Sequence, residues 1–162
     1  MSTHRYPWYP GTGWLDETGT GGGEGYNINV PLLPGATDED YAYIFNKIFV
    51  PVALQFKPDI VMVSAGMDAQ ENDMLGGMRL TSKGFATLAE YIKKISDLTC
   101  KRTALVLEGG YQHDKLADSI YRVLMALNTE TQLPEIQGDN ISENVLKRVE
   151  KIIRINSQWW NF

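Results

Sequence analysis

The 162-residue sequence contains one cysteine, Cys100, and two histidines, His4 and His113. A single cysteine excludes an intramolecular disulfide and a cysteine-only metal cage. Its scarcity also fits a reducing compartment, so we expect a cytoplasmic protein. The two histidines lie far apart in the chain and do not form the closely spaced pair with which a helix binds a metal ion.

Long apolar runs and clusters of basic residues are missing as well. No stretch approaches the roughly 20 apolar residues that a membrane-spanning helix needs, and the first residues lack the basic and apolar regions of a signal peptide. The 15 lysines and arginines are outnumbered by 20 aspartates and glutamates, which gives a net charge of -5. Because clustered positive charge binds the phosphate backbone, we expect neither nucleic acid nor membrane as a partner.

Glycine, proline and aromatic residues are instead concentrated in the first 26 residues. Residues 5–13 read RYPWYPGTG, and residues 19–25 read GTGGGEG. This density disfavours regular elements, yet an exposed tail rarely carries so many aromatic side chains. We therefore expect a long loop that lines a surface, since long irregular segments inside a domain are often functional.

The rest of the chain alternates between strand and helix patterns. Strand patterns cover residues 26–30, 60–63 and 103–107. Amphipathic helix patterns cover residues 38–57, 82–96, 114–127 and 142–155. Thr37 is the expected N-cap of the first helix, and Pro51 is expected to kink it. The last two strand patterns are apolar runs typical of strands buried on both faces, so the alternation predicts an α/β fold with parallel strands and right-handed crossovers.

The composition shifts after Asn128 to Thr, Glu, Gln, Pro and Gly, which predicts a linker over residues 129–139. We therefore divide the chain into a domain segment, residues 1–128, and a segment of linker and C-terminal amphipathic helix, residues 129–162. That helix is expected to pack back on the domain or on a partner.

Polar residues follow both of the expected buried strands. Residues 64–68 read SAGMD and end at Asp68, whereas residues 107–111 read LEGGY and end at Tyr111. Ligands of open parallel sheets bind at the carboxyl ends of the strands. A carboxylate there can bind a metal ion, and a phenol can donate a hydrogen bond to a developing oxyanion. Position alone favours the simpler alternative, in which Asp68 caps its loop and Tyr111 packs against it.

Several motifs, taken together, resemble the histone deacetylase superfamily, which includes acetoin-utilisation proteins and acetylpolyamine amidohydrolases. They occur in the family's order at residues 4–6, 9–13, 25–31 and 64–68, at Asp73, and at residues 75–77 and 107–111. The resemblance covers Ser2 to Asn128. It implies a three-layer αβα fold of the arginase and deacetylase kind with a parallel sheet, of which this chain is only a part, the C-terminal half of the catalytic domain.

The resemblance also implies roles for individual residues. It makes Asp68 a zinc ligand and Tyr111 the catalytic residue that stabilises the tetrahedral oxyanion. It implies that four residues line the substrate tunnel: Tyr9, Leu75, Gly109 and Gly110. Tyr26 resembles a residue whose backbone oxygen binds a structural potassium ion. The implied reaction is zinc-dependent hydrolysis of N-acetyl amides, with an acetyl-lysine or an acetylated polyamine as substrate.

The chain departs from the family pattern in one large respect. The paired general-base histidines and the Asp-x-His zinc ligands lie upstream of the family segment that residues 4–13 resemble, and this sequence lacks them. Catalytic zinc normally has three protein ligands. We therefore expect the chain alone to be inactive and to need the missing N-terminal half or a homo-oligomeric partner. The alternative is a non-catalytic remnant, an interaction module that binds a partner through its exposed sheet edge and terminal helix.

Overall fold

The computed structural model describes residues 1–130, 133 and 140–162, so most of the predicted linker lies outside the described residues. The strands are β1 (Ser2–Arg5), β2 (Asn29–Leu32), β3 (Val61–Ala65) and β4 (Thr103–Leu107). The helical segments are η1 (Gly21–Gly23), α1 (Asp38–Ile44), the π-helical η2 (Phe45–Phe49), α2 (Val50–Phe56), α3 (Ser82–Leu98), α4 (His113–Asn128) and α5 (Glu143–Asn156). In the described part of the chain, no helix is both long and apolar enough to cross a membrane.

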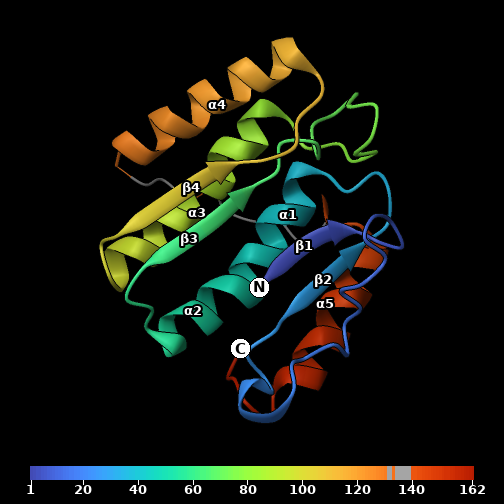
Figure 1. Ribbon diagram of the computed structural model, residues 1–162, viewed down its shortest axis with the longest axis vertical. Coiled ribbons are helices and arrows are strands. Elements are labelled where there is room, and N and C mark those ends of the chain that lie inside the picture. Colours follow the sequence, from blue (N-terminus) through green and yellow to red (C-terminus); the bar gives the residue numbers. More distant parts are fainter. Residues whose placement is uncertain (131–132, 134–139) are drawn as a thin grey trace.

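The strands form two separate parallel pairs, β1 with β2 and β3 with β4 (Figure 1). Figure 1 shows α3 behind β3 and β4, and α5 behind β2. The contacts agree, because α3 packs on β3 and α5 packs on β2 and η2. The predicted α/β fold with parallel strands is therefore confirmed, and the C-terminal amphipathic helix packs back on the described domain.

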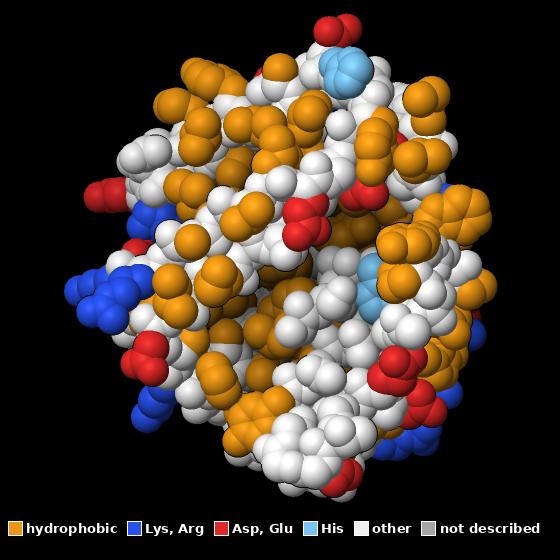
Figure 2. Space-filling view, in the orientation of Figure 1, with side chains coloured by type: hydrophobic (Ala, Val, Ile, Leu, Met, Phe, Trp, Pro, Cys, Tyr) orange, Lys and Arg blue, Asp and Glu red, His pale blue; other side chains and the backbone are white. Residues whose placement is uncertain are grey.

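The prediction that β3 and β4 are buried on both faces is wrong for this chain. Met62 is 71% exposed and Val106 is 55% exposed, whereas Val63 and Leu105 pack against the core. A strand is buried on both faces only when a layer covers each face, and within the described residues α3 covers one, with α4 packed against α3. Hydrophobic side chains consequently gather on the open face over β3, β4 and α4 (Figure 2).

The prediction also missed β1 and placed the following strand too early. The backbone N–H of Ser2 donates to the Ile28 oxygen at 2.9 Å, and that of Tyr6 donates to the Leu32 oxygen at 3.0 Å. Successive residues of a strand turn their backbone groups to alternate sides, so position 31 faces away from β1. Pro31 therefore removes no hydrogen bond from this ladder and can sit inside β2 rather than end it.

The first predicted helix is interrupted rather than simply kinked. Thr37 is its N-cap as expected, because its side chain accepts from the Asp40 backbone while the Asp40 carboxylate accepts from the Thr37 backbone. The helix then widens into the π-helical segment η2, and Pro51 lies in the first turn of α2. The missing N–H of Pro51 thus falls where one helical hydrogen-bonding pattern gives way to another.

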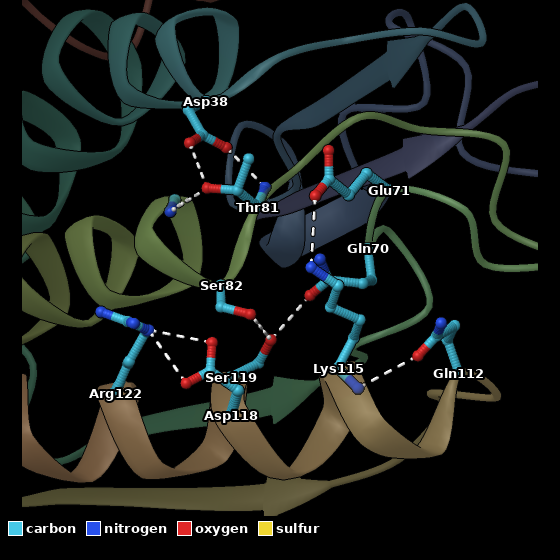
Figure 3. A network of polar contacts seen from close by, with 11 residues as sticks. Asp38, Gln70, Glu71, Thr81, Ser82, Gln112, Lys115, Asp118, Ser119 and Arg122 are labelled. Carbon is cyan, nitrogen blue, oxygen red and sulfur yellow. Dashed lines mark hydrogen bonds and ion pairs between the residues drawn. The ribbon is translucent and has the colours of Figure 1, made fainter.

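Acidic residues in the first turn of α1 join the starts of two other helices. The buried Asp40 carboxylate accepts from the backbone N–H and the hydroxyl of Ser142, at 2.8 and 2.7 Å, at the start of α5. Asp38 accepts from the backbone N–H and the hydroxyl of Thr81, at 2.7 and 2.6 Å (Figure 3). Thr81 is the N-cap of α3. These contacts fix α3 and α5 relative to α1.

Replacing Asp40 with alanine is expected to lower the free energy of unfolding by about 3 kcal/mol. The change removes a buried, charged acceptor from the N–H groups of Thr37 and Ser142 and from the Ser142 hydroxyl, and charge-assisted bonds contribute about 1.5–3 kcal/mol each. The exposed neighbour Glu39 provides a matched control, since Glu39→Ala should cost less than about 0.5 kcal/mol. Urea unfolding of both variants measures the difference, and equal losses would contradict this role.

Candidate functional site

A cavity of about 580 Å³ opens between β1 and β3. All residues of β1 line it, as do Val63, Ser64 and Ala65 of β3. Hydrophobic side chains from α1, η2 and α3 also line it, among them Tyr41, Phe45, Phe85, Leu88 and Ile92. Figure 2 shows the hollow near the middle of this face, with hydrophobic side chains inside it. The cavity therefore combines an apolar interior with the edges of two strands.

The loops that follow β3 and β4 meet at this cavity, as their position at strand ends predicted. Asp68, Tyr111, Tyr9 and Leu75 all line it. Tyr9 is 93% exposed and Tyr111 is 47% exposed, so both rings are open to solvent. A carboxylate, a phenol and an apolar rim thus border one space.

The remaining predicted site residues are the tunnel glycines, Gly109 and Gly110, and the potassium-site residue Tyr26, and they lie in different places. Gly109 and Gly110 connect β4 to Tyr111, and Gly109 packs directly against the Asp68 carboxylate. Tyr26 does not line the cavity; it packs edge-on against Phe56 and Trp160. Of the predicted tunnel residues, Tyr9 and Leu75 line the cavity with Asp68, whereas Gly109 and Gly110 lie behind its lining and Tyr26 lies apart.

Glycines leave the space that Asp68 occupies. A Cβ atom at Gly76 would lie 1.5 Å from the Asp68 backbone oxygen, and one at Gly109 would lie 3.1 Å from its carboxylate. A side chain at position 76 would have to displace one of the two backbones. The glycines of the loops after β3 and β4 thereby allow close packing around Asp68.

Tyr41 is a buried cavity residue that the sequence indicated only as a core position of a helix. Burial raises the pKa of its phenol, and the negative charges of Asp68 and Asp40 raise that pKa further. The phenol is therefore neutral at physiological pH. No pattern in the sequence placed Tyr41 near Asp68, because their proximity arises only from the packing of a helix against a loop in the tertiary structure.

Arg5 is a second residue whose place the sequence did not predict. Its Nη1 atom donates to the backbone oxygen of Leu75 at 3.3 Å and to that of Gly76 at 3.5 Å. Its guanidinium carbon lies 4.1 Å from the centre of the Trp8 ring, a cation–π contact. Arg5 thus links the end of β1 to the loop that carries Leu75.

One histidine is held by hydrogen bonds within the chain, and the other is exposed. His4 accepts from the Ser2 hydroxyl through Nδ1 at 3.0 Å and donates to the Gly13 oxygen through Nε2 at 2.9 Å. Burial lowers the pKa of His4, which favours the neutral ring with these two contacts. His113 is exposed at the first turn of α4. His4 therefore ties β1 to the loop after it.

The described residues do not complete a zinc site. Within them, no group of three or more His, Cys, Asp and Glu side chains is placed to hold a metal ion. Asp68, Glu108 and His4 all line the cavity, but they do not come together as such a group. Because a catalytic zinc takes three protein ligands, this part of the chain alone does not fit the ion.

The family model described as "Histone deacetylase domain" matches residues 1–127 of the chain. A probable deacetylase of Archaeoglobus fulgidus is 34% identical over 174 residues, which cover 99% of this chain and 48% of that protein. Histone deacetylase HDA1 of Saccharomyces cerevisiae is 34% identical over 99% of this chain and 23% of its own length. The chain thus spans about half, or less, of these curated relatives.

Two solved structures show the same fold. The HDA15 HD domain gives a TM-score of 0.84 at 34% identity and covers 98% of this chain and 43% of its own. The histone deacetylase Clr3 gives a TM-score of 0.87 at 31% identity and covers 98% of this chain and 27% of its own. These likenesses confirm the predicted deacetylase-like α/β fold.

Proposed function

The chain belongs to the histone deacetylase domain family, and on that premise we propose that it is the C-terminal half of a deacetylase domain. The completed domain hydrolyses N-acetyl amides, with acetyl-lysine or an acetylated polyamine as substrate. One observation carries this proposal: Asp68 and Tyr111 border the same cavity, together with the apolar rim residues Tyr9 and Leu75.

Tyr111 serves the reaction as a hydrogen-bond donor. Its phenol lies at a partly open cavity, where it can donate to the acetyl oxygen as negative charge develops there. Such a bond strengthens in the transition state and therefore raises turnover more than it tightens substrate binding. Tyr9, Trp8 and Leu75 offer apolar surface to the methylene chain of an acylated amine.

Asp68 contributes one ligand to the zinc ion that the family resemblance implies. Bound zinc polarises a carbonyl group and lowers the pKa of a water molecule. The remaining ligands and the general base come from the N-terminal half of the domain, since within the described residues no group of three or more His, Cys, Asp and Glu side chains is placed to hold a metal ion. The isolated chain is accordingly inactive.

The cavity between β1 and β3 offers a place for one strand of that other half. β1 pairs with β2 and β3 pairs with β4, while the cavity lies between β1 and β3 at their unpaired edges. Strands in a sheet are about 4.8 Å apart, so one strand inserted between β1 and β3 would need these two strands to lie about 10 Å apart, and it would join both pairs into one sheet. If the inserted strand runs parallel to its neighbours, its carboxyl end lies at the same end of the sheet as Asp68, where the further zinc ligands are needed.

The open apolar face adds a second surface for the same partner. On β3 and β4 it exposes Met62 and Val106, and on α4 it exposes Tyr121, Leu124 and Met125. Contiguous apolar surface of this kind marks interaction sites. A second copy of the chain or an unrelated protein could cover it instead, which would make the chain a non-catalytic interaction module.

A chimera distinguishes these functions. In it, this chain replaces the matching segment of the Archaeoglobus fulgidus relative, which supplies the rest of the domain. The proposal predicts that the purified chimera hydrolyses an acetyl-lysine peptide or acetylated polyamine, whereas the isolated chain does not. A folded, monomeric chimera that hydrolyses neither substrate would favour the interaction module.

A further inference from the structure

Asp73 joins the two loops that border the cavity. It lies between β3 and α3, and only 7% of the residue is exposed. Its Oδ1 accepts from the backbone N–H groups of Leu75 and Gly76, at 2.8 and 3.1 Å. Its Oδ2 accepts from the backbone N–H of Tyr111 at 2.8 Å. One carboxylate therefore holds a rim loop and the Tyr111 loop together.

The carboxylate is suited to this task because it is charged and both of its oxygens are used. Burial acts to raise the pKa of Asp73, but hydrogen bonds from the backbones of Leu75, Tyr111, Gly76 and Gln112 outweigh it and hold the pKa below its usual range. An ionised carboxylate accepts on both oxygens, whereas an amide accepts on only one.

The backbone before Tyr111 has a separate anchor. The N–H of Met67 donates to the Gly109 oxygen at 2.8 Å. Gly110 then adopts a φ of +143°, a conformation that side chains rarely allow. Tyr111 follows directly, and its backbone N–H bonds Asp73. The direction of the Tyr111 ring thus depends on Gly109 on one side and Asp73 on the other.

We propose that Asp73 is a positioning residue, which sets the place of the Tyr111 hydroxyl in the cavity by fixing the Tyr111 backbone to the Leu75–Gly76 loop. The catalytic consequence rests on the proposed deacetylase function. The geometric part concerns the isolated chain and is independent of any activity.

The variant Asp73→Asn tests whether the carboxylate holds the two loops together. Asparagine keeps the size of the side chain, but its single acceptor oxygen can serve one loop while its NH2 group opposes the N–H of the other. Asp118→Asn is the matched control, because Asp118 is a partly exposed carboxylate paired with Arg122 on α4 (Figure 3).

Amide hydrogen exchange of the isolated chain, followed by NMR, tests the geometry. In Asp73→Asn, exchange should accelerate about tenfold at Tyr111, or at Leu75 and Gly76, while the amides of α3 keep their protection. Asp118→Asn should change none of these rates. Unchanged rates at all three loop amides would overturn the proposal, as would equal acceleration throughout α3, because Asp73 would then act on the whole fold.

Turnover of the chimera tests the catalytic consequence. Asp73→Asn should lower kcat by about 10²-fold, the effect of a misplacement of about 1 Å, with little change in KM or zinc content. Combined with Tyr111→Phe, it should cause no further loss, since both changes act through one hydroxyl. Fully additive losses would overturn the positioning role. If the wild-type chimera is inactive, the proposed function fails, and the exchange rates still decide the role of Asp73.

Discussion

Replacing Tyr111 with phenylalanine is expected to lower the turnover of the completed deacetylase by about 10²–10³-fold, the usual effect of removing one oxyanion donor. The change removes a single oxygen from a ring that is half exposed at the cavity. The loss should appear in kcat, with KM nearly constant, because the hydroxyl acts on charge that exists only near the transition state.

The control for this prediction is Tyr43→Phe, which removes a hydroxyl from a half-buried tyrosine on α1 that does not line the cavity. It should leave turnover within about twofold of the parent. Melting temperature and zinc content, measured on the same samples, should be equal for both variants. A Tyr111→Phe chimera with full activity would remove Tyr111 from the mechanism.

Replacing Asp68 with asparagine should raise the dissociation constant of zinc in the completed domain by more than about 100-fold. Changes to groups that only orient metal ligands already cost about 10–100-fold, and this change removes an anionic ligand. When zinc is limiting, the turnover of Asp68→Asn should fall in proportion to the zinc that the variant retains. Competition with a chelator measures the constant directly.

Asp59→Asn is the matched control for Asp68→Asn, because Asp59 is exposed just before β3. It should retain zinc like the parent. In zinc-free buffer, both variants should unfold at nearly the same denaturant concentration as the parent, since each change is isosteric and bound zinc no longer adds to stability. If Asp68→Asn kept zinc but lost stability, Asp68 would be a loop-capping residue, the simpler alternative that its position first favoured.

Local patterns predicted the elements whose signals are contained within a few turns. Helix α3 follows from Thr81 as N-cap and from apolar residues at helical spacing, of which Phe85, Ala89, Ile92 and Ile95 are buried. Strand β4 begins and ends at the predicted residues. Propensity, capping and periodicity all agree in these segments, which is why they can be predicted from sequence.

Features that depend on distant partners could not be predicted in the same way. Strand β1 is short and polar, and it becomes a strand only by pairing with β2 across the loop between them. The exposure of Met62 depends on which layers cover β3, and its apolar pattern alone does not reveal that.

The candidate site likewise has one feature that local patterns predict and another that depends on distant partners. Its position was predictable because parallel strands bring Asp68 and Tyr111 to one sheet edge. The bonds that fix the site were not, because Asp73 reaches a residue 38 positions away and Arg5 reaches one 70 positions away. Such contacts depend on tertiary structure and leave no periodic signal.

The central claim is tested most directly by zinc content. The isolated chain and the chimera are treated briefly with the same chelator, and the zinc that each retains is determined by elemental analysis. The claim is that Asp68 is one ligand of a site completed by the other half of the domain. The account predicts no stoichiometric zinc in the isolated chain and about one zinc ion per molecule of the chimera. Tightly held zinc in the isolated chain, or a folded chimera that holds none, would contradict it.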